Sequence, residues 1–159
     1  MDHLTIDERL RDALDITPDA CTRLRTRSGA WMTRLKQLEK DGLRQVKEKG
    51  ENYYIVKVDE EDMGNLLDEM ENEISTMQGI RDPALVTRII ASSRRFSEVR
   101  RPREFSFTRD ADGNWNFTMD DVVMKMPDPS PFALVEPKKR YGHLFDFDKL
   151  ATGKAPAEK

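Results

Sequence analysis

The sequence predicts an α+β fold, and three observations support the prediction. Apolar residues recur at helical spacing over 28–40, and two strand-like runs joined by a short turn follow over 43–58. Helical spacing resumes over 59–101. Apolar and polar residues then alternate along two runs within 102–126, which is typical of a β-hairpin.

The composition indicates a protein of a reducing compartment. The chain has 159 residues, 37% of them hydrophobic, and its single cysteine, Cys21, excludes an intrachain disulfide. No apolar stretch reaches membrane-spanning length, and the first residues are too polar for a signal peptide. We therefore expect a cytoplasmic protein with no membrane partner.

The charge is unevenly distributed, although the net charge is only −3. Residues 22–57 contain ten Lys or Arg and four Asp or Glu, whereas 58–78 contain eight acids and no base. Residues 80–103 return to seven bases and two acids. Such blocks indicate surfaces with different partners, or segments that pair with each other.

The N-terminal part predicts three helices. The first is amphipathic, and the second starts at Thr17-Pro18, where Thr caps and Pro takes the first helical position. A compact turn at 25–27 then separates it from a third helix over 28–40, which ends at Asp41-Gly42 because Gly accepts a positive φ. The apolar positions of the first helix are Ile6, Leu10, Ala13 and Leu14, and the residues of the third helix expected in the core are Trp31, Leu35 and Leu38.

A helix that ends in LEKDGL and runs directly into a basic, Gly-turned hairpin resembles the recognition helix and wing of the winged helix-turn-helix superfamily. The resemblance covers residues 4–58 and implies a domain over 1–58, with the recognition helix at 28–40 and the wing at 43–58. It implies that the partner is double-stranded DNA, with the recognition helix in the major groove. The residues that it places at DNA are Arg25, Arg27, Ser28, Met32, Thr33, Arg34, Lys36, Lys47, Lys49 and Tyr53.

The acidic stretch 59–78 predicts a helix with a heptad-like apolar seam. The seam consists of Met63, Leu67, Met70, Ile74 and Met77. One interpretation is a dimerisation helix, which would make the protein a homodimer. The other is an amphipathic helix that packs on its own domain.

A basic helix is expected next, from Asp82-Pro83 to about residue 101. It could contact DNA phosphates, but we favour pairing with the acidic helix that precedes it. The hairpin over 102–126 should turn at 110–114, where the residues suit a tight turn. Oxygen-bearing residues from Asp110 to Asp121 follow the EF-hand spacing, but Trp115 stands where that loop needs Gly. We therefore expect no metal.

The tail over 127–150 is rich in proline, which predicts an extended segment. Its apolar residues should anchor it across its own domain or on a protein partner. The anchors assigned to partner docking are Phe132, Tyr141, Leu144, Phe145 and Phe147. Residues 151–159 are small and polar, and we expect them to be disordered.

The sequence contains no convergent set of reactive groups, so we expect no catalytic residues and no cofactor. His3 and His143 have no obvious carboxylate or cysteine partner, and no phosphate-binding loop is present. The leading hypothesis is a dimeric DNA-binding regulator of transcription. The alternative is a non-catalytic scaffold subunit of a larger assembly, such as a phage or plasmid complex, whose winged helix, hairpin and tail dock partners.

Overall fold

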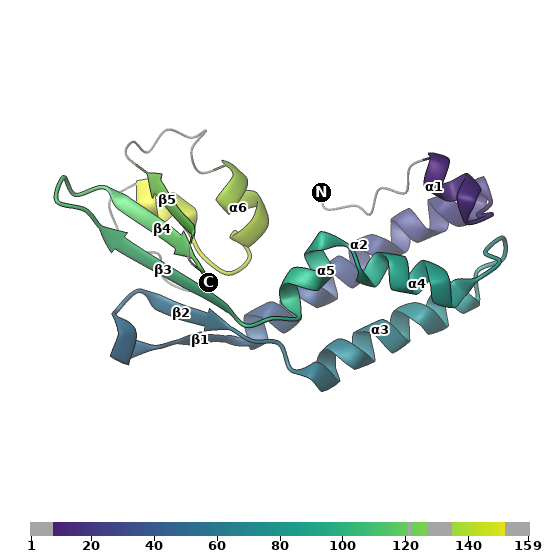
Figure 1. The fold of residues 1–159 in the computed structure, drawn as a ribbon, viewed down its shortest axis with the longest axis horizontal. Coiled ribbons are helices and arrows are strands. Elements are labelled where there is room, and N and C mark those ends of the chain that lie inside the picture. Colours follow the sequence, from purple (N-terminus) through teal and green to yellow (C-terminus); the bar gives the residue numbers. More distant parts are fainter. Residues whose placement is uncertain (1–7, 121, 127–134, 152–159) are drawn as a thin grey trace. The chain divides into compact units, whose positions relative to one another are not determined.

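The protein is an α+β protein with seven α-helices and a five-stranded antiparallel sheet in the part of the chain that the structure describes (Figure 1). This structure is a computed structural model, and it describes residues 8–120, 122–126 and 135–151. The chain forms two compact units. Unit 1 contains 1–38 and 58–101, and unit 2 contains 39–57 and 102–159. The boundary at 102 was expected, but the division within the N-terminal part was not.

Unit 1 is helical, and all of its helices except α1 contribute buried residues to one apolar core. They are α1 (Glu8–Ala13), α2 (Pro18–Asp41) as far as residue 38, α3 (Glu60–Ser75), α4 (Pro83–Ala91) and α5 (Arg94–Val99). The core residues are Ile16, Ala20, Leu24, Trp31, Leu35, Leu38, Met63, Leu66, Met70, Ile74, Val86, Ile90, Phe96 and Val99.

Helix α2 is continuous, so the turn expected at 25–27 is wrong. Buried Leu24, Ser28, Trp31 and Leu35 follow at spacings of four, three and four, which carries one buried face through the expected turn. The Ser28 hydroxyl does not cap a new helix; it donates to the Arg25 carbonyl at 2.7 Å. The hairpin of the winged-helix prediction does follow this helix, and membership of that superfamily stays a prediction.

The proline-based helix starts are confirmed. Helix α2 begins at Pro18 with the Thr17 hydroxyl accepting from the Ala20 amide, and α4 begins at Pro83 with the Asp82 carboxylate accepting from the Leu85 amide. The expected basic helix is nevertheless two helices, because α4 ends at Ala91 and α5 begins at Arg94.

The end of α2 at Asp41 is also confirmed, but by a different mechanism. Gly42 does not adopt a positive φ; among the described glycines, Gly50, Gly79 and Gly113 do. Instead, the Arg44 guanidinium donates to the Asp41 carbonyl at 2.8 Å, and the Lys57 amide donates to the Gly42 carbonyl at 3.1 Å. These donors satisfy carbonyls that a helix end leaves without partners.

The seam expected for dimerisation faces the core of unit 1. Met63, Met70 and Ile74 are buried, and Leu67 and Met77 are half-buried against the same core. This is the intramolecular alternative for the 59–78 stretch. The acidic helix does pair with a basic one, but the bidentate ion pair that the structure records joins Glu73 of α3 to Arg27 of α2.

Unit 2 is built on a meander of five strands in the order β1-β2-β3-β4-β5. The strands are β1 (Leu43–Gln45), β2 (Tyr53–Val56), β3 (Arg103–Arg109), β4 (Trp115–Met119) and β5 (Val122–Met126), and a 3-10 turn, η1 (Lys47–Lys49), joins the first two. The expected wing is therefore not a free hairpin, because β2 also pairs with β3, with Val56 opposite Arg103. The expected hairpin and its turn at 110–114 are confirmed, with Gly113 at a φ of +83° and a third strand, β5, added.

One face of the sheet carries an aromatic core that two short helices complete. The helices are α6 (Val135–Tyr141) and α7 (Phe147–Ala151). Four anchors assigned to partner docking are buried in this core, which agrees with the alternative that the tail lies across its own domain; they are Tyr141, Leu144, Phe145 and Phe147. Phe145 contacts rings from both β2 and β3, including Tyr54 and Phe107. Phe132 and the terminus over 152–159 lie outside the described residues.

Candidate nucleic-acid interface

The solvent side of α2 carries basic residues between two exposed acids, Asp19 near its start and Asp41 at its end. Between Ala20 and Leu38 the helix has five bases and no acid. The one acid of the predicted recognition helix, Glu39, is 0% exposed. Over most of its length, α2 therefore presents a purely cationic surface, which we call the α2 cationic face. Its basic residues are Arg23, Arg25, Arg27, Arg34 and Lys36.

The middle of the α2 cationic face consists of small residues. Thr22, Thr26, Gly29 and Thr33 follow at spacings of four, three and four, so they form one stripe along the helix. The three threonine hydroxyls donate to the carbonyls four residues earlier and project little. A Cβ atom added at Gly29 would meet no atom within 4 Å, so the stripe is open in front of it.

The basic side chains flank this stripe on both sides. Arg23, Arg27 and Arg34 differ by four and seven positions, which places them along one flank. Arg25 and Lys36 are about three turns apart and lie along the other flank. A helix face that is low in the middle and cationic on both sides can approach a groove between two phosphate backbones closely.

Two of these arginines are fixed by contacts within unit 1. The Arg27 guanidinium donates to both carboxylate oxygens of Glu73 at 2.6 Å, and Arg23 donates to the Gln78 carbonyl at 2.6 Å. The hydrogen bonds and charge of Arg27 lower the pKa of Glu73, and Glu73 raises the pKa of Arg27. Arg27 is therefore partly neutralised, so Arg25 and Arg34 are the stronger candidates for phosphate contacts.

The residues that were assigned to base contacts differ in their exposure to solvent. Ser28 is only 2% exposed and Met32 is half-buried against the core, so neither is placed to read base edges. Thr33 is exposed, but its hydroxyl is already used within the helix. Arg25 and Arg34 are exposed.

The assigned wing residues belong to unit 2. Lys47 is exposed. The Lys49 ammonium lies 3.3 Å from both the Tyr53 hydroxyl and the Glu104 carboxylate, and the Tyr53 hydroxyl donates to Glu104. These hydrogen bonds raise the pKa values of Lys49 and Tyr53 and lower that of Glu104. The Lys49 charge is therefore partly satisfied by Glu104, which weakens its assignment to DNA.

A buried polar cluster in unit 2, which the sequence did not reveal, explains why Glu39 is hidden. The Glu39 carboxylate accepts from the Arg103 guanidinium and lies 2.7 Å from His143 Nε2. We call these three residues the Glu39 cluster. The expectation that His143 lacks a carboxylate partner is therefore wrong. One sequence signal was available: Glu39 stands four residues after Leu35, on the apolar side of the helix, where an acid requires a partner.

The Glu39 cluster is shielded from solvent. The side chains of Glu39, Arg103 and His143 are 0%, 5% and 10% exposed. A carboxylate-imidazole pair can act as a general base, but it needs access to a substrate. Among the described residues no three His, Cys, Asp or Glu side chains gather closely enough to hold a metal ion. Within unit 2, the cluster therefore ties Glu39, in the last turn of α2, to β3 and to the turn after α6.

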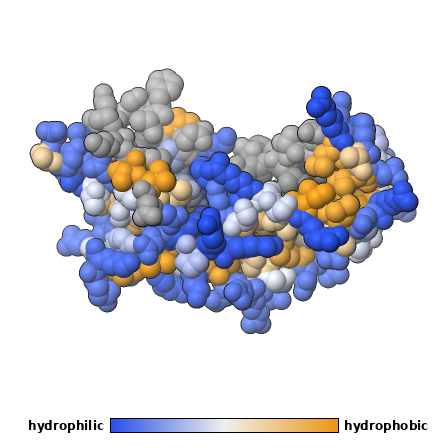
Figure 2. Space-filling view, in the orientation of Figure 1, coloured by the Kyte–Doolittle hydropathy of each residue, from blue (hydrophilic) through white to orange (hydrophobic). Residues whose placement is uncertain are grey.

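The rest of the surface that can be viewed is largely hydrophilic. On the face drawn in Figure 2, hydrophobic residues gather over α4, which exposes Leu85. Within the part of the chain that the structure describes, no helix combines the length and apolarity needed to cross a membrane.

Comparisons with protein-family models, with curated proteins and with solved structures find no match to this chain.

Proposed function

We propose that this protein binds double-stranded DNA through the α2 cationic face. The observation that carries the proposal is the burial of Glu39, which leaves the solvent side of α2 without an exposed acid from Ala20 as far as Lys40. The acids at the end of the predicted recognition helix, Glu39 and Asp41, favour the scaffold alternative over DNA binding, and Asp41 is exposed at the end of α2. The Glu39 carboxylate is buried in unit 2, where it pairs with Arg103 and His143.

The expected mode of binding is through phosphates. Arg25 on one flank and Arg34 on the other would each contact a backbone, while the stripe at Gly29 lets the helix approach. Phosphate contacts give affinity that depends steeply on salt, and they carry no sequence information. Sequence-specific regulation by a homodimer would need further base contacts and an interface outside the α3 seam.

The test is fluorescence anisotropy of a random DNA duplex with the full-length protein, between about 50 and 200 mM salt. We expect a Kd in the micromolar range at low salt. The double variant R25Q/R34Q should lower the slope of log K against log salt by roughly 1.8, since each lost phosphate contact removes about 0.9. The matched control is R81Q/R88Q, which removes two exposed charges of unit 1 that lie outside α2.

A second variant tests the approach of the helix itself. Gly29→Leu adds a side chain to the open stripe and should block DNA without unfolding α2, because Leu forms helices better than Gly. Wild-type affinity and salt slope in both R25Q/R34Q and G29L would overturn the proposal. The mass of the free protein, measured alongside, tests the homodimer.

A second candidate function is a scaffold that docks protein partners, and one observation favours it. Strand β5 is an edge strand, and it exposes Val122 and Val123 by 59% and 57%. Exposed apolar edge strands are sites for pairing with another chain. The variant V122K/V123K should abolish any cross-link between β5 and a partner protein while leaving DNA binding unchanged. Cross-links that persist would exclude β5 as the docking strand.

A further inference from the structure

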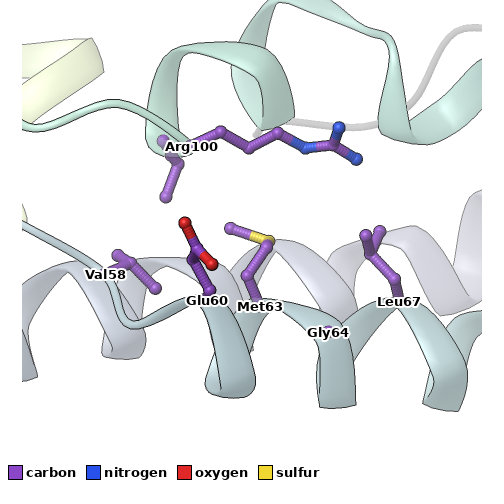
Figure 3. Close-up of a pocket in the computed structure, with 7 residues that line it drawn as sticks. Val58, Glu60, Met63, Gly64, Leu67 and Arg100 are labelled. Carbon is purple, nitrogen blue, oxygen red and sulfur yellow. The ribbon is translucent and has the colours of Figure 1, made fainter.

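A groove in unit 1 lies between the N-terminal half of α3 and the end of α5 (Figure 3). Its volume is about 340 Å³. Helix α3 contributes Met63, Gly64 and Leu67, and the end of α5 contributes Val99 and Arg100. This volume is at the small end of the range for ligand pockets, roughly 300–1,000 Å³.

The floor of the groove is apolar and has an open position. Met63 and Val99 are buried and Leu67 is half-buried, so hydrocarbon surface lines the bottom. Gly64 leaves space between Met63 and Leu67 (Figure 3), and a Cβ atom added there would meet no atom within 4 Å. Gly in a helix interior costs stability relative to other residues. The groove would be shallower with any other residue at this position.

Two opposite charges border this floor. The Arg100 side chain extends above Met63 towards Leu67, and the Glu60 carboxylate points into the gap beside Val58 (Figure 3). Among the residues that the structure describes, neither Arg100 nor Glu60 has a hydrogen-bond or ion-pair partner. The guanidinium is therefore available to an anion that lies on the apolar floor, whereas Glu60 repels an anion at its own end.

We propose that this groove binds a small apolar carboxylate. The hydrocarbon part lies on Met63, Leu67 and Val99, and the carboxylate pairs with the Arg100 guanidinium. Glu60 sets the orientation, because the reversed ligand would place two carboxylates side by side. The inference does not depend on DNA binding, since the groove and the α2 cationic face share no residue.

The size of the groove limits the length of the ligand, and octanoate is a suitable probe. Each methylene buried on apolar surface contributes about 0.8 kcal/mol, which corresponds to roughly a fourfold change in affinity. Hexanoate, which lacks two methylenes, should therefore bind roughly fifteenfold more weakly than octanoate. The neutral analogue octan-1-ol should bind about fivefold more weakly, because an exposed ion pair contributes up to about that factor.

The experiment is a titration of the full-length protein with octanoate, followed by chemical-shift changes of the Met63 methyl group and the Leu67 methyl groups. Two variants test the assignment. Gly64→Leu should abolish saturable binding while raising thermal stability, because it fills the open position with a better helix former. Arg100→Gln should weaken octanoate about fivefold and leave octan-1-ol unchanged.

Matched controls separate this site from the DNA site. Gly29→Leu makes the same substitution on α2 and should leave octanoate binding unchanged, while Gly64→Leu should leave DNA binding unchanged. Arg101→Gln removes an exposed charge next to Arg100 and should also have no effect. Octan-1-ol that binds as tightly as octanoate, or octanoate binding that survives in Gly64→Leu, would overturn the proposal.

Discussion

Replacing Glu39 with leucine should destabilise unit 2 strongly. The carboxylate is fully buried and accepts from both Arg103 and His143. The Nε and Nη1 atoms of Arg103 are buried without a hydrogen-bond partner among the described residues, so Glu39 provides the counter-charge for this guanidinium. Removing one member of a buried ion pair typically costs about 3–5 kcal/mol. We expect E39L to lower the free energy of unfolding by about that amount.

The double variant E39L/R103M distinguishes the ion pair from loss of packing. Two apolar residues of similar volume can replace a buried ion pair at little cost. We therefore expect the double variant to lie within about 1 kcal/mol of wild type, and R103M alone to be as damaging as E39L. With single losses of about 3–5 kcal/mol each, the coupling energy of the cycle should be about 5 kcal/mol or more.

Urea unfolding, followed by the fluorescence of Trp115, measures this energy. Trp115 belongs to the core of unit 2, and Trp31→Phe removes the signal of unit 1. For an m-value near 1.5 kcal/mol/M, a loss of about 3 kcal/mol shifts the midpoint by about 2 M. Strictly additive single variants, or a loss below about 1 kcal/mol for E39L, would refute the view that Glu39 balances a buried charge.

Three further predictions concern the stability of the fold in units 1 and 2. Gly79→Ala should cost about 2–3 kcal/mol in thermal unfolding, because Gly79 has a φ of +86° and the added Cβ would clash with the Thr17 hydroxyl that caps α2. Arg27 lowers the pKa of Glu73, so the ion pair stabilises the fold fully above the pKa of an unpaired Glu, about 4.3, and this contribution is lost as pH falls through the lowered pKa. The difference in urea midpoint between R27Q and wild type should therefore be largest at pH 7 and should shrink progressively as the pH is lowered into the acid range. Phe145→Ala should cost about 3–5 kcal/mol, whereas an anchor for an external partner would leave the free protein's stability unchanged.

Local chemistry made part of the fold predictable. The starts at Thr17-Pro18 and Asp82-Pro83 follow from hydrogen bonds and a fixed φ within four residues. The 110–114 turn follows from one aspartate, since the Asp110 carboxylate accepts from the Asp112 and Asn114 amides. These elements depend on no distant contact, and their boundaries were therefore close to those observed.

Elements that depend on distant contacts were not predictable in the same way. The charged run at 25–27 looked like a turn, but the core of unit 1 holds Leu24 and Ser28 on one continuous helix face. In the tail, the described residues 135–151 form two short helices where an extended segment was expected, because the sheet offers an aromatic surface that Tyr141 and Phe145 complete. The proline-rich residues 127–134 lie outside the described residues. In both cases packing overrode the local preference.

The candidate site shows the same contrast. The exposed Arg25 and Arg34 were visible in the sequence as part of a basic block, and the structure keeps them exposed. The fate of Glu39 was not visible, because its partner Arg103 lies far along the chain and became a neighbour only through the pairing of β3 with β2. Counting charges along the sequence therefore includes Glu39, although its carboxylate is buried and paired in the folded protein.

Because Val56 pairs with Arg103, the segment between them begins and ends at neighbouring strands of the sheet. Residues 58–101 form one excursion that leaves and returns at adjacent strands of the same sheet. Its ends are therefore as close as the ends of a hairpin loop, about 5 Å between paired Cα atoms. Replacing the excursion with a two-residue Asn-Gly turn should leave an uninterrupted meander of five strands, in which β2 and β3 become an ordinary hairpin. The shortened protein would lack the groove between α3 and α5, because all the residues that line it belong to 58–101.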